Sequence, residues 1–299
     1  MDIFKKLEVI RREILIFAVL SLILFLFGFV ALAILPAGVS RTVFSAVSFG
    51  AFLATLGMIR LRVSAYKHLY SQHMLKHSME TEFDDVTYDP KAGLPSEVIA
   101  STDMIMMGNC YESSEYRTGR YRGTSFEMAD VCLKSHFREG RRRSDITYFQ
   151  GTWMVFTFEG HFCESLQVKE KSFMNAQKPK GEHPELDRVA VGSDELARVF
   201  KVYGESAAQA ERFLSPELQK AILSLNYELP GDLMFYFYRD RLHIAIHGRR
   251  AQYEPPLLGR LYREEVERVL LSDCHAVQRF LDTLLSDRSL FCDSSPDSV

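Results

Sequence analysis

ILIFAVLSLILFLFGFVALAIL, from Ile14 to Leu35, is a run of 22 residues without a charge. A second uncharged run, from Thr42 to Ile59, follows the short break Leu35–Arg41. The hydrocarbon core of a bilayer is about 30 Å thick, and a helix of about 20 apolar residues crosses it. The sequence therefore predicts a transmembrane hairpin over residues 1–62, with spans at about 14–35 and 42–59.

Two other interpretations of these runs stay open. A cleaved signal peptide has an apolar core of about 7–15 residues, whereas the first run is longer and leads directly into a second one. A buried helix of a soluble protein is the other alternative. Small residues let helices approach closely in lipid, so Gly50 and Gly57, seven positions apart, predict a contact face on the second helix.

Positive residues are concentrated outside the two runs. Four precede the first run and three follow the second, whereas the break carries only Arg41; the seven are Lys5, Lys6, Arg11, Arg12, Arg60, Arg62 and Lys67. Segments rich in Lys and Arg remain on the cytoplasmic side. We therefore expect a multi-pass protein of the cell inner (plasma) membrane with both termini in the cytoplasm. Neither run contains an ionisable side chain, which argues against a channel or transporter.

The 299-residue chain contains five cysteines and no CxxC pair. An odd number without close pairs predicts free thiols in a reducing compartment rather than a disulfide framework. A structural zinc site would need close ligand pairs, so no metal and no cofactor are expected. The aromatic residues recur at strand periods, which predicts core packing rather than stacking on bases. No nucleic-acid partner is expected.

Residues 63–82 continue the helical pattern and predict a juxtamembrane stalk. Its basic residues either contact anionic lipid head groups or only set the topology, and both interpretations stay open. The breakers Tyr88-Asp89-Pro90 and Gly93-Leu94-Pro95 then indicate the start of a folded cytoplasmic domain over residues 83–285. The tail, 286–299, is short and polar, which predicts disorder.

Strand patterns dominate the folded domain. We predict strands at residues 96–101, 123–133, 146–158, 188–191, 198–203, 233–238 and 242–247. The strand at 146–158 is apolar on both faces and is expected at the centre of the sheet. Ser215 and Pro216 predict a helix start, and the apolar stripe from Arg263 to about Leu285 predicts a long amphipathic helix.

The expected fold class is therefore α+β. A two-helix N-terminal transmembrane hairpin precedes a mostly antiparallel sheet domain with a few helices and a long C-terminal amphipathic helix. Such a domain is compatible with a PH-like arrangement.

The segment Lys134–Arg143 is rich in positive charge and predicts a loop between two strands. Such a segment attracts phosphates or anionic lipid head groups. The candidate anion- or lipid-binding residues are Lys134, Arg138, Arg141, Arg142 and Arg143. The same run is also compatible with a solvated loop that binds nothing.

Motifs of known catalytic chemistry are absent from the sequence. It contains no Gly-rich phosphate loop and no GxSxG nucleophile motif. His243 and His247 share one face of a predicted strand, which we expect to be solvated or partly covered rather than to hold a metal. His161 stands two residues before Cys163, but the members of a catalytic pair are usually distant in sequence.

Several short segments between Phe83 and Leu258 resemble one known family. They include Tyr88-Asp89 with Gly93-Leu94, Phe126-Glu127-Met128-Ala129, Phe149-Gln150-Gly151, Leu214-Ser215-Pro216, Leu242-His243-Ile244-Ala245-Ile246 and Tyr253-Glu254-Pro255-Pro256-Leu257. In order and spacing they resemble the bacterial membrane-protein family known as domain of unknown function 3137. The resemblance implies two N-terminal spans and a cytoplasmic α+β domain, and it implies no reaction and no catalytic residue.

Two functional hypotheses follow from these observations. The first is a membrane-anchored cytoplasmic interaction or regulatory module that contacts the lipid bilayer, anionic lipid head groups or a protein partner. The second is a membrane-tethered enzyme of unrecognised type that uses His243, His247 or His161 with a nearby carboxylate. The two differ in whether those histidines meet acidic residues in one cleft.

Overall fold

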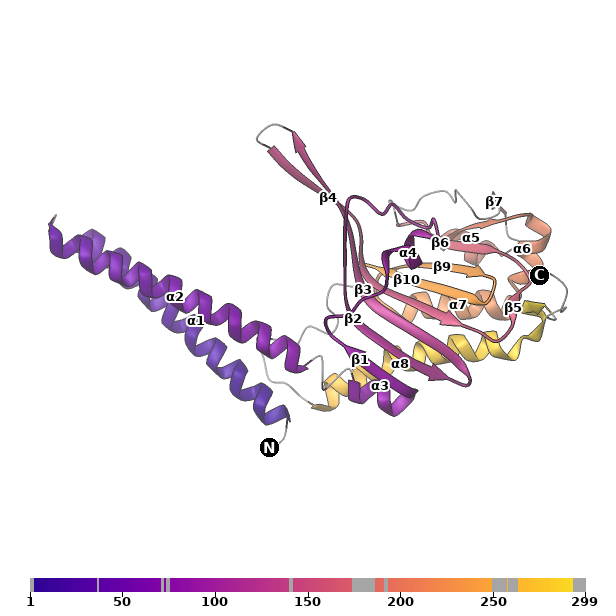
Figure 1. The fold of residues 1–299 in the computed structure, drawn as a ribbon, viewed down its shortest axis with the longest axis horizontal. Coiled ribbons are helices and arrows are strands. Elements are labelled where there is room, and N and C mark those ends of the chain that lie inside the picture. The colour runs from indigo at the N-terminus through magenta and orange to yellow at the C-terminus, as the bar shows by residue number, and fades with distance from the viewer. Residues whose placement is uncertain are drawn as a thin grey trace. The chain divides into compact units, whose positions relative to one another are not determined.

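The computed structural model describes residues 3–36, 38–70, 73, 76–139, 142–173, 186–190, 193–248, 257 and 263–292. The chain divides into two compact units (Figure 1). One contains residues 1–75 with 253–268, and the other contains residues 76–252 with 269–299.

The first unit contains two helices of 32 residues each, α1 (Ile3–Ile34) and α2 (Val39–Tyr70). Both are long and apolar enough to cross a membrane, and only 22% and 17% of their most apolar windows is buried. A core helix of a soluble protein would be mostly buried, so this exposure favours contact with lipid. The predicted pair of apolar helices is confirmed, and each helix is longer than the predicted span.

Small residues bring α1 and α2 together. A Cβ at Gly28 would lie 3.2 Å from the Cβ of Ser48, and Ser48 and Thr55 are buried although they belong to apolar helices. By contrast, no described atom lies within 4 Å of a Cβ built at Gly50 or Gly57. The predicted contact face through these two glycines is therefore wrong, because α1 packs on the serine and threonine side of α2.

The second unit is built on a single antiparallel sheet of nine strands in the order β1-β2-β3-β4-β10-β9-β6-β8-β7. The strands are β1 (Asp84–Asp89), β2 (Cys110–Tyr121), β3 (Thr124–Glu139), β4 (Arg142–Thr157), β6 (Leu166–Glu170), β7 (Asp187–Val189), β8 (Phe200–Gly204), β9 (Asp232–Tyr238) and β10 (Arg241–His247). Strands β5 (His161–Phe162) and β11 (Phe291–Cys292) form a separate pair. The large sheet is open, with β1 and β7 at its edges, so the PH-like arrangement is not formed.

The helices of this unit are α3 (Lys76–Glu82), α4 (Ser96–Ala100), α5 (Asp194–Val199), α6 (Ala207–Phe213), α7 (Pro216–Glu228) and, from Val269 onward, α8 (Arg263–Ser286), with a 3-10 helix η2 (Arg288–Leu290). The predicted start of α7 is confirmed, because Ser215 Oγ accepts a hydrogen bond from the Leu218 amide at 3.3 Å. The mostly antiparallel sheet, the few helices and the long C-terminal helix are the predicted α+β fold.

The strands alternate between two cores, one on each face of the sheet. The first face carries Phe156, Phe235 and Ile244 and packs against apolar residues of α7 and α8, which lie behind the sheet in Figure 1. The second face carries Trp153 and Ala245 and packs against Leu94, Ile99, Met104 and Ile105. These four residues belong to one segment, 94–105, which includes α4 and covers the second face.

Four local predictions need correction. The predicted strand at 96–101 is helix α4, since a short helix is enough to bury Ile99. Residues 198–199 belong to α5, and only the rest of that predicted strand is β8. The predicted loop 134–143 is mostly strand, because β3 and β4 extend to Glu139 and from Arg142. The tail is ordered as far as Cys292, where β11 pairs with β5; residues 293–299 lie outside the described part.

Candidate functional site

The predicted basic segment forms the end of a long β3–β4 hairpin. Strand pairing continues through Ser135–Ile146, Phe137–Ser144 and Glu139–Arg142, and the hairpin projects beyond the rest of the sheet in Figure 1. Arg138 is exposed, and Arg142 and Arg143 belong to β4. Arg141 lies outside the described residues.

Lys134 stands apart from the rest of the predicted basic site. Its Nζ lies 3.1 Å from Glu112 Oε2 on the neighbouring strand β2. This hydrogen bond raises the pKa of Lys134. The carboxylate therefore balances the charge of Lys134, and the structure does not bring this residue together with Arg138 at the end of the hairpin.

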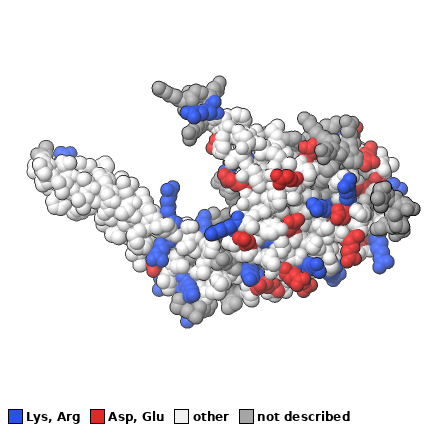
Figure 2. Space-filling view, viewed as in Figure 1, with Lys and Arg blue, Asp and Glu red and all other residues white. Residues whose placement is uncertain are grey.

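The projecting hairpin has one apolar and one polar face. Directly opposed residues of an antiparallel pair point to the same side, so the register places Phe137 and Ile146 on one face. Their side chains are 45% and 46% exposed. His136 is on the other face and contacts Asp145 at 2.7 Å. Figure 2 shows positive charge near the end of this hairpin, where Arg138 is exposed.

A row of polar side chains crosses the second face of the main sheet. Register pairs Val155 with His243, His243 with Tyr236, Tyr236 with Gln167, and Gln167 with Tyr203. Among them His243, Tyr236 and Gln167 are buried. Burial of polar groups costs free energy unless they are hydrogen-bonded, so their partners determine how this face is held together.

The covering segment supplies backbone acceptors to this row. Gln167 Nε2 donates to the Thr102 carbonyl at 3.0 Å. Lys169, on the same strand, donates from Nζ to the Met104 carbonyl at 3.1 Å. These bonds fix residues 102–104 over the sheet, and they explain why this face is closed rather than solvated.

Lys169 is the most strongly perturbed base in the described domain. Burial lowers its pKa to about 7, with the nearby Asp103 carboxylate acting in the opposite direction. Its Nζ also lies 5.4 Å from the centre of the Tyr203 ring. A lysine with a pKa near neutrality can lose its proton at physiological pH, which makes it chemically distinct from a surface lysine.

Next to this row lies a pocket of about 370 Å³. The turn between β9 and β10 forms one wall, and the end of α4 forms the other. Its lining residues are Ser101, Thr102, Tyr236, Tyr238, Arg239, Asp240, Arg241 and His243. The pocket is thus open to solvent at the arginine side chains and ends at buried tyrosine and histidine side chains.

His243 is oriented by the only tryptophan of the chain. Trp153 Nε1 donates to His243 Nδ1 at 3.2 Å. An indole nitrogen can only donate a hydrogen bond, so a neutral His243 carries its proton on Nε2. The prediction that His243 lies on a solvated or partly covered face is wrong, because residues 94–105 cover this face and leave His243 5% exposed.

The other predicted histidines do not join this site. His247 accepts a hydrogen bond from the Gln150 amide at 3.2 Å, and burial lowers the pKa of His247. His161 is exposed on β5. Within the described residues no three His, Cys, Asp or Glu side chains form a group that could hold a metal.

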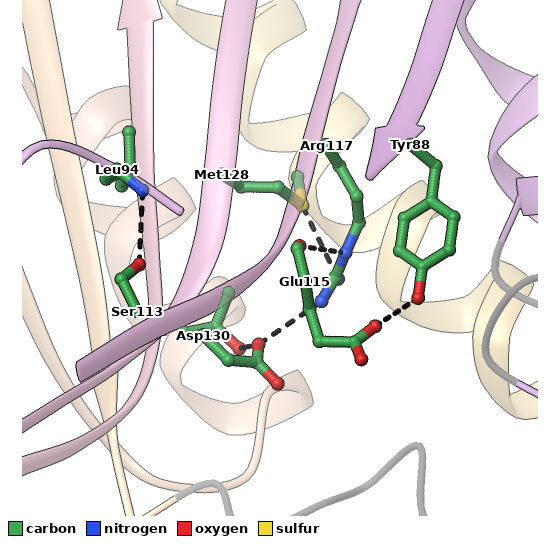
Figure 3. A network of polar contacts seen from close by, with 8 residues as sticks. Tyr88, Leu94, Ser113, Glu115, Arg117, Met128 and Asp130 are labelled. Carbon is green, nitrogen blue, oxygen red and sulfur yellow. Dashed lines mark hydrogen bonds and ion pairs between the residues drawn. The ribbon is translucent and has the colours of Figure 1, made fainter. Parts of the chain in front are cut away.

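A second polar cluster lies where β2 bulges between Ser114 and Arg117 (Figure 3). Arg117 is 2% exposed; its Nε donates to the Glu115 carbonyl at 2.9 Å, and its Nη2 lies 3.2 Å from Asp130 Oδ1. The Glu115 carboxylate in turn accepts a hydrogen bond from the Tyr88 hydroxyl. The cluster ties β1, β2 and β3 together, so we interpret it as structural.

The free-thiol prediction is wrong for two of the five cysteines. Cys163 and Cys292 form a disulfide across a sequence separation of 129 residues. It joins the ends of β5 and β11 and so fixes the C-terminal segment to the chain that follows β4. Spacing could not reveal the pair, because the two cysteines come together only when η2 folds back on β5.

Sequence reasoning also missed Lys169, Gln167 and the pocket. Lys169 and Gln167 alternate with Val168 in a short strand, a pattern that normally indicates one solvated face. Only the position of the segment 94–105 shows that this face is covered.

Comparison with known proteins supports the predicted resemblance over part of the chain. Residues 147–285 match the family described as protein of unknown function, DUF3137. No curated protein matches the chain. A solved structure with some similarity is the mycobacterial trehalose monomycolate transport factor A, TtfA, at 9% identity and a TM-score of 0.39, covering 72% of this chain and 95% of that one.

Proposed function

We propose that this chain, which resembles the DUF3137 family over residues 147–285, is an integral membrane protein whose α+β domain works as an interaction or regulatory module. The observation that carries this proposal is the pair of 32-residue apolar helices with exposed side chains. Exposed apolar surface of this extent is rare in soluble proteins. The absence of a recognisable reaction motif in the sequence favours binding over catalysis.

The charge distribution supports a location with both termini in the cytoplasm of a cell with an inner membrane. Seven Lys and Arg residues flank the hairpin outside its two apolar runs, and one, Arg41, lies between them. The Cys163–Cys292 disulfide argues against this location, because disulfides persist mainly in oxidising compartments. In the cytoplasm this pair would be two thiols held close enough to oxidise.

Thiol trapping in intact cells tests the orientation. Cells are acidified and alkylated before lysis, and the full chain is then compared on gels with and without reductant. If the domain is cytoplasmic, as proposed, cellular reductants keep the Cys163–Cys292 pair reduced, and we expect both thiols to be alkylated. A Cys163–Cys292 disulfide that is already present when the cells are alkylated would place the domain in an oxidising compartment. That result would contradict the proposed orientation.

The projecting hairpin is the part of the module that we assign to anionic lipid. It combines the exposed apolar residues Phe137 and Ile146 with a basic end that includes Arg138. Apolar side chains enter the lipid interface, while Lys and Arg near an anionic surface contribute about 1 kcal/mol each. Lys134 is left out of this contact because Glu112 already balances its charge.

Vesicle flotation of residues 76–299 tests this contact, since this piece holds the whole sheet and both of its cores. We expect binding to vesicles that contain phosphatidylserine and weaker binding to pure phosphatidylcholine. Replacing Arg141, Arg142 and Arg143 with glutamine should remove most of the difference. Arg198→Gln, an exposed charge on α5, is the matched control. Equal flotation of the triple variant and the control would remove the hairpin from the proposal.

A further inference from the structure

The pocket beside the second sheet face is lined by polar side chains, among them two arginines. Arg239 and Arg241, which are exposed, line its opening, and Tyr236 and Tyr238 line its wall. His243 also lines the pocket, and its Nδ1 accepts a hydrogen bond from Trp153 Nε1. Burial raises the pKa of Tyr236, so its hydroxyl keeps its proton throughout the physiological pH range.

The side chain of Arg239 packs on the neighbouring Tyr238 ring. Arg239 lies 5.1 Å above the centre of the Tyr238 ring, and its carbonyl accepts a hydrogen bond from the Phe162 amide at 2.7 Å. Arg239 has φ 51°, a left-handed conformation that glycine or asparagine adopts more easily. The two-residue turn between β9 and β10 accounts for this conformation, because such hairpin turns favour a positive φ.

We propose that this pocket binds the oxyanion group of a small ligand, a carboxylate or a phosphate. Oxyanions accept several hydrogen bonds, and arginine recognises them through two parallel N–H donors. Arg239 and Arg241 both line a volume of about 370 Å³, which is the size of a small-molecule site. This site is separate from the hairpin, and neither proposal depends on the other.

Asp240 is the lining residue that opposes an anion. It stands between the two arginine residues in the turn, so the charged lining residues are two cations and one anion. The charge of Asp240 therefore determines the direction in which a substitution changes the affinity for the ligand. Removal of its charge should strengthen the binding of an anion, whereas it would weaken the binding of a cation.

Trp153 is a built-in reporter for the pocket. It is the only tryptophan of the chain, and its indole is hydrogen-bonded to His243, which lines the pocket. A ligand that contacts His243 changes the environment of this indole. Its fluorescence in the full chain, purified in detergent, therefore reports on this site alone.

Titration of the full chain with inorganic phosphate and with acetate, at constant ionic strength set by chloride, tests the proposal. We expect a saturable change in Trp153 fluorescence and a matching heat in calorimetry for at least one probe. Arg239→Gln and Arg241→Gln should each weaken the binding about tenfold, the size of one hydrogen bond to a charged group. Asp240→Asn should tighten it several-fold.

Two further variants separate the pocket from general charge effects. Ser101→Phe fills the cavity without a change of charge and should abolish binding. Arg198→Gln removes an exposed arginine elsewhere in the domain and should leave the affinity unchanged. The proposal is overturned if neither probe binds saturably, if Ser101→Phe binds as the unmodified chain does, or if Asp240→Asn weakens binding.

Discussion

Lys169→Met tests whether one buried amine controls how the stability of the sheet domain varies with pH. Lys169 is 1% exposed, and its hydrogen bond to the Met104 carbonyl fixes the segment that covers the second sheet face. Methionine has a similar length and fills the same space without a charge. The variant therefore removes the titrating group while it leaves the packing nearly intact.

The expected effect follows from the pKa of Lys169, which burial lowers from 10.5 to about 7. At about 1.4 kcal/mol for each pKa unit, full protonation of Lys169 in the folded state costs about 5 kcal/mol. Between pH 7 and 10.5 the unfolded chain binds this proton and the folded chain does not. The free energy of unfolding therefore rises with pH in this window, and the whole penalty is present below pH 7.

Urea unfolding of residues 76–299 at several pH values measures this effect through Trp153 fluorescence. Between pH 7 and 9 the free energy of unfolding of the unmodified piece should rise by about 2 kcal/mol more than that of Lys169→Met. Subtracting the pH profile of the Lys169→Met variant removes the contribution of other groups that titrate in this range. Parallel pH profiles for the two proteins would show that Lys169 keeps an ordinary pKa and would refute the reasoning.

Two other substitutions probe the packing of the sheet, each measured by urea unfolding. Gly151→Ala would place a Cβ 1.9 Å from the Ile246 carbonyl oxygen of β10 and should lower the free energy of unfolding by about 3 kcal/mol or more. The control is Gly123→Asn, in a turn where φ is 86° and no described atom lies near the added Cβ; it should be tolerated. Arg117→Met should cost about 2 kcal/mol, because Asp130 loses its buried partner but stays 44% exposed to water. An unchanged midpoint for Gly151→Ala or Arg117→Met would contradict the corresponding contact.

The central part of the sheet was predictable because its signals are local. Strands β9 and β10 alternate cleanly on either side of a short turn, and Ser215 and Pro216 determine the start of α7. The long apolar strand at 146–158 was correctly expected near the centre of the sheet, where β4 pairs with β3 and β10. In each case residues a few positions apart determine the structure.

The errors have a common cause in contacts that are distant in the sequence. The segment 134–143 has the charge of a loop, yet strand pairing extends into it, because each residue from Lys134 to Glu139 has a partner on β4. The Cys163–Cys292 bond depends on the return of the chain after α8. The pocket depends on α4, which was predicted as a strand. The candidate site therefore could not be predicted, although most of the strands that form it could.

The two faces of the main sheet differ in a way that stability does not require. The first face is covered by α7 and α8 and is filled with apolar side chains. The second face buries Lys169, Gln167 and His243, and Gln167 Oε1 has no hydrogen-bond partner among the described residues. Apolar residues of similar size would close this face at a lower cost in desolvation. Proteins keep buried polar groups that stability does not need mainly where function needs them. The second face, with its pocket, is therefore the part of this domain where we expect function to lie.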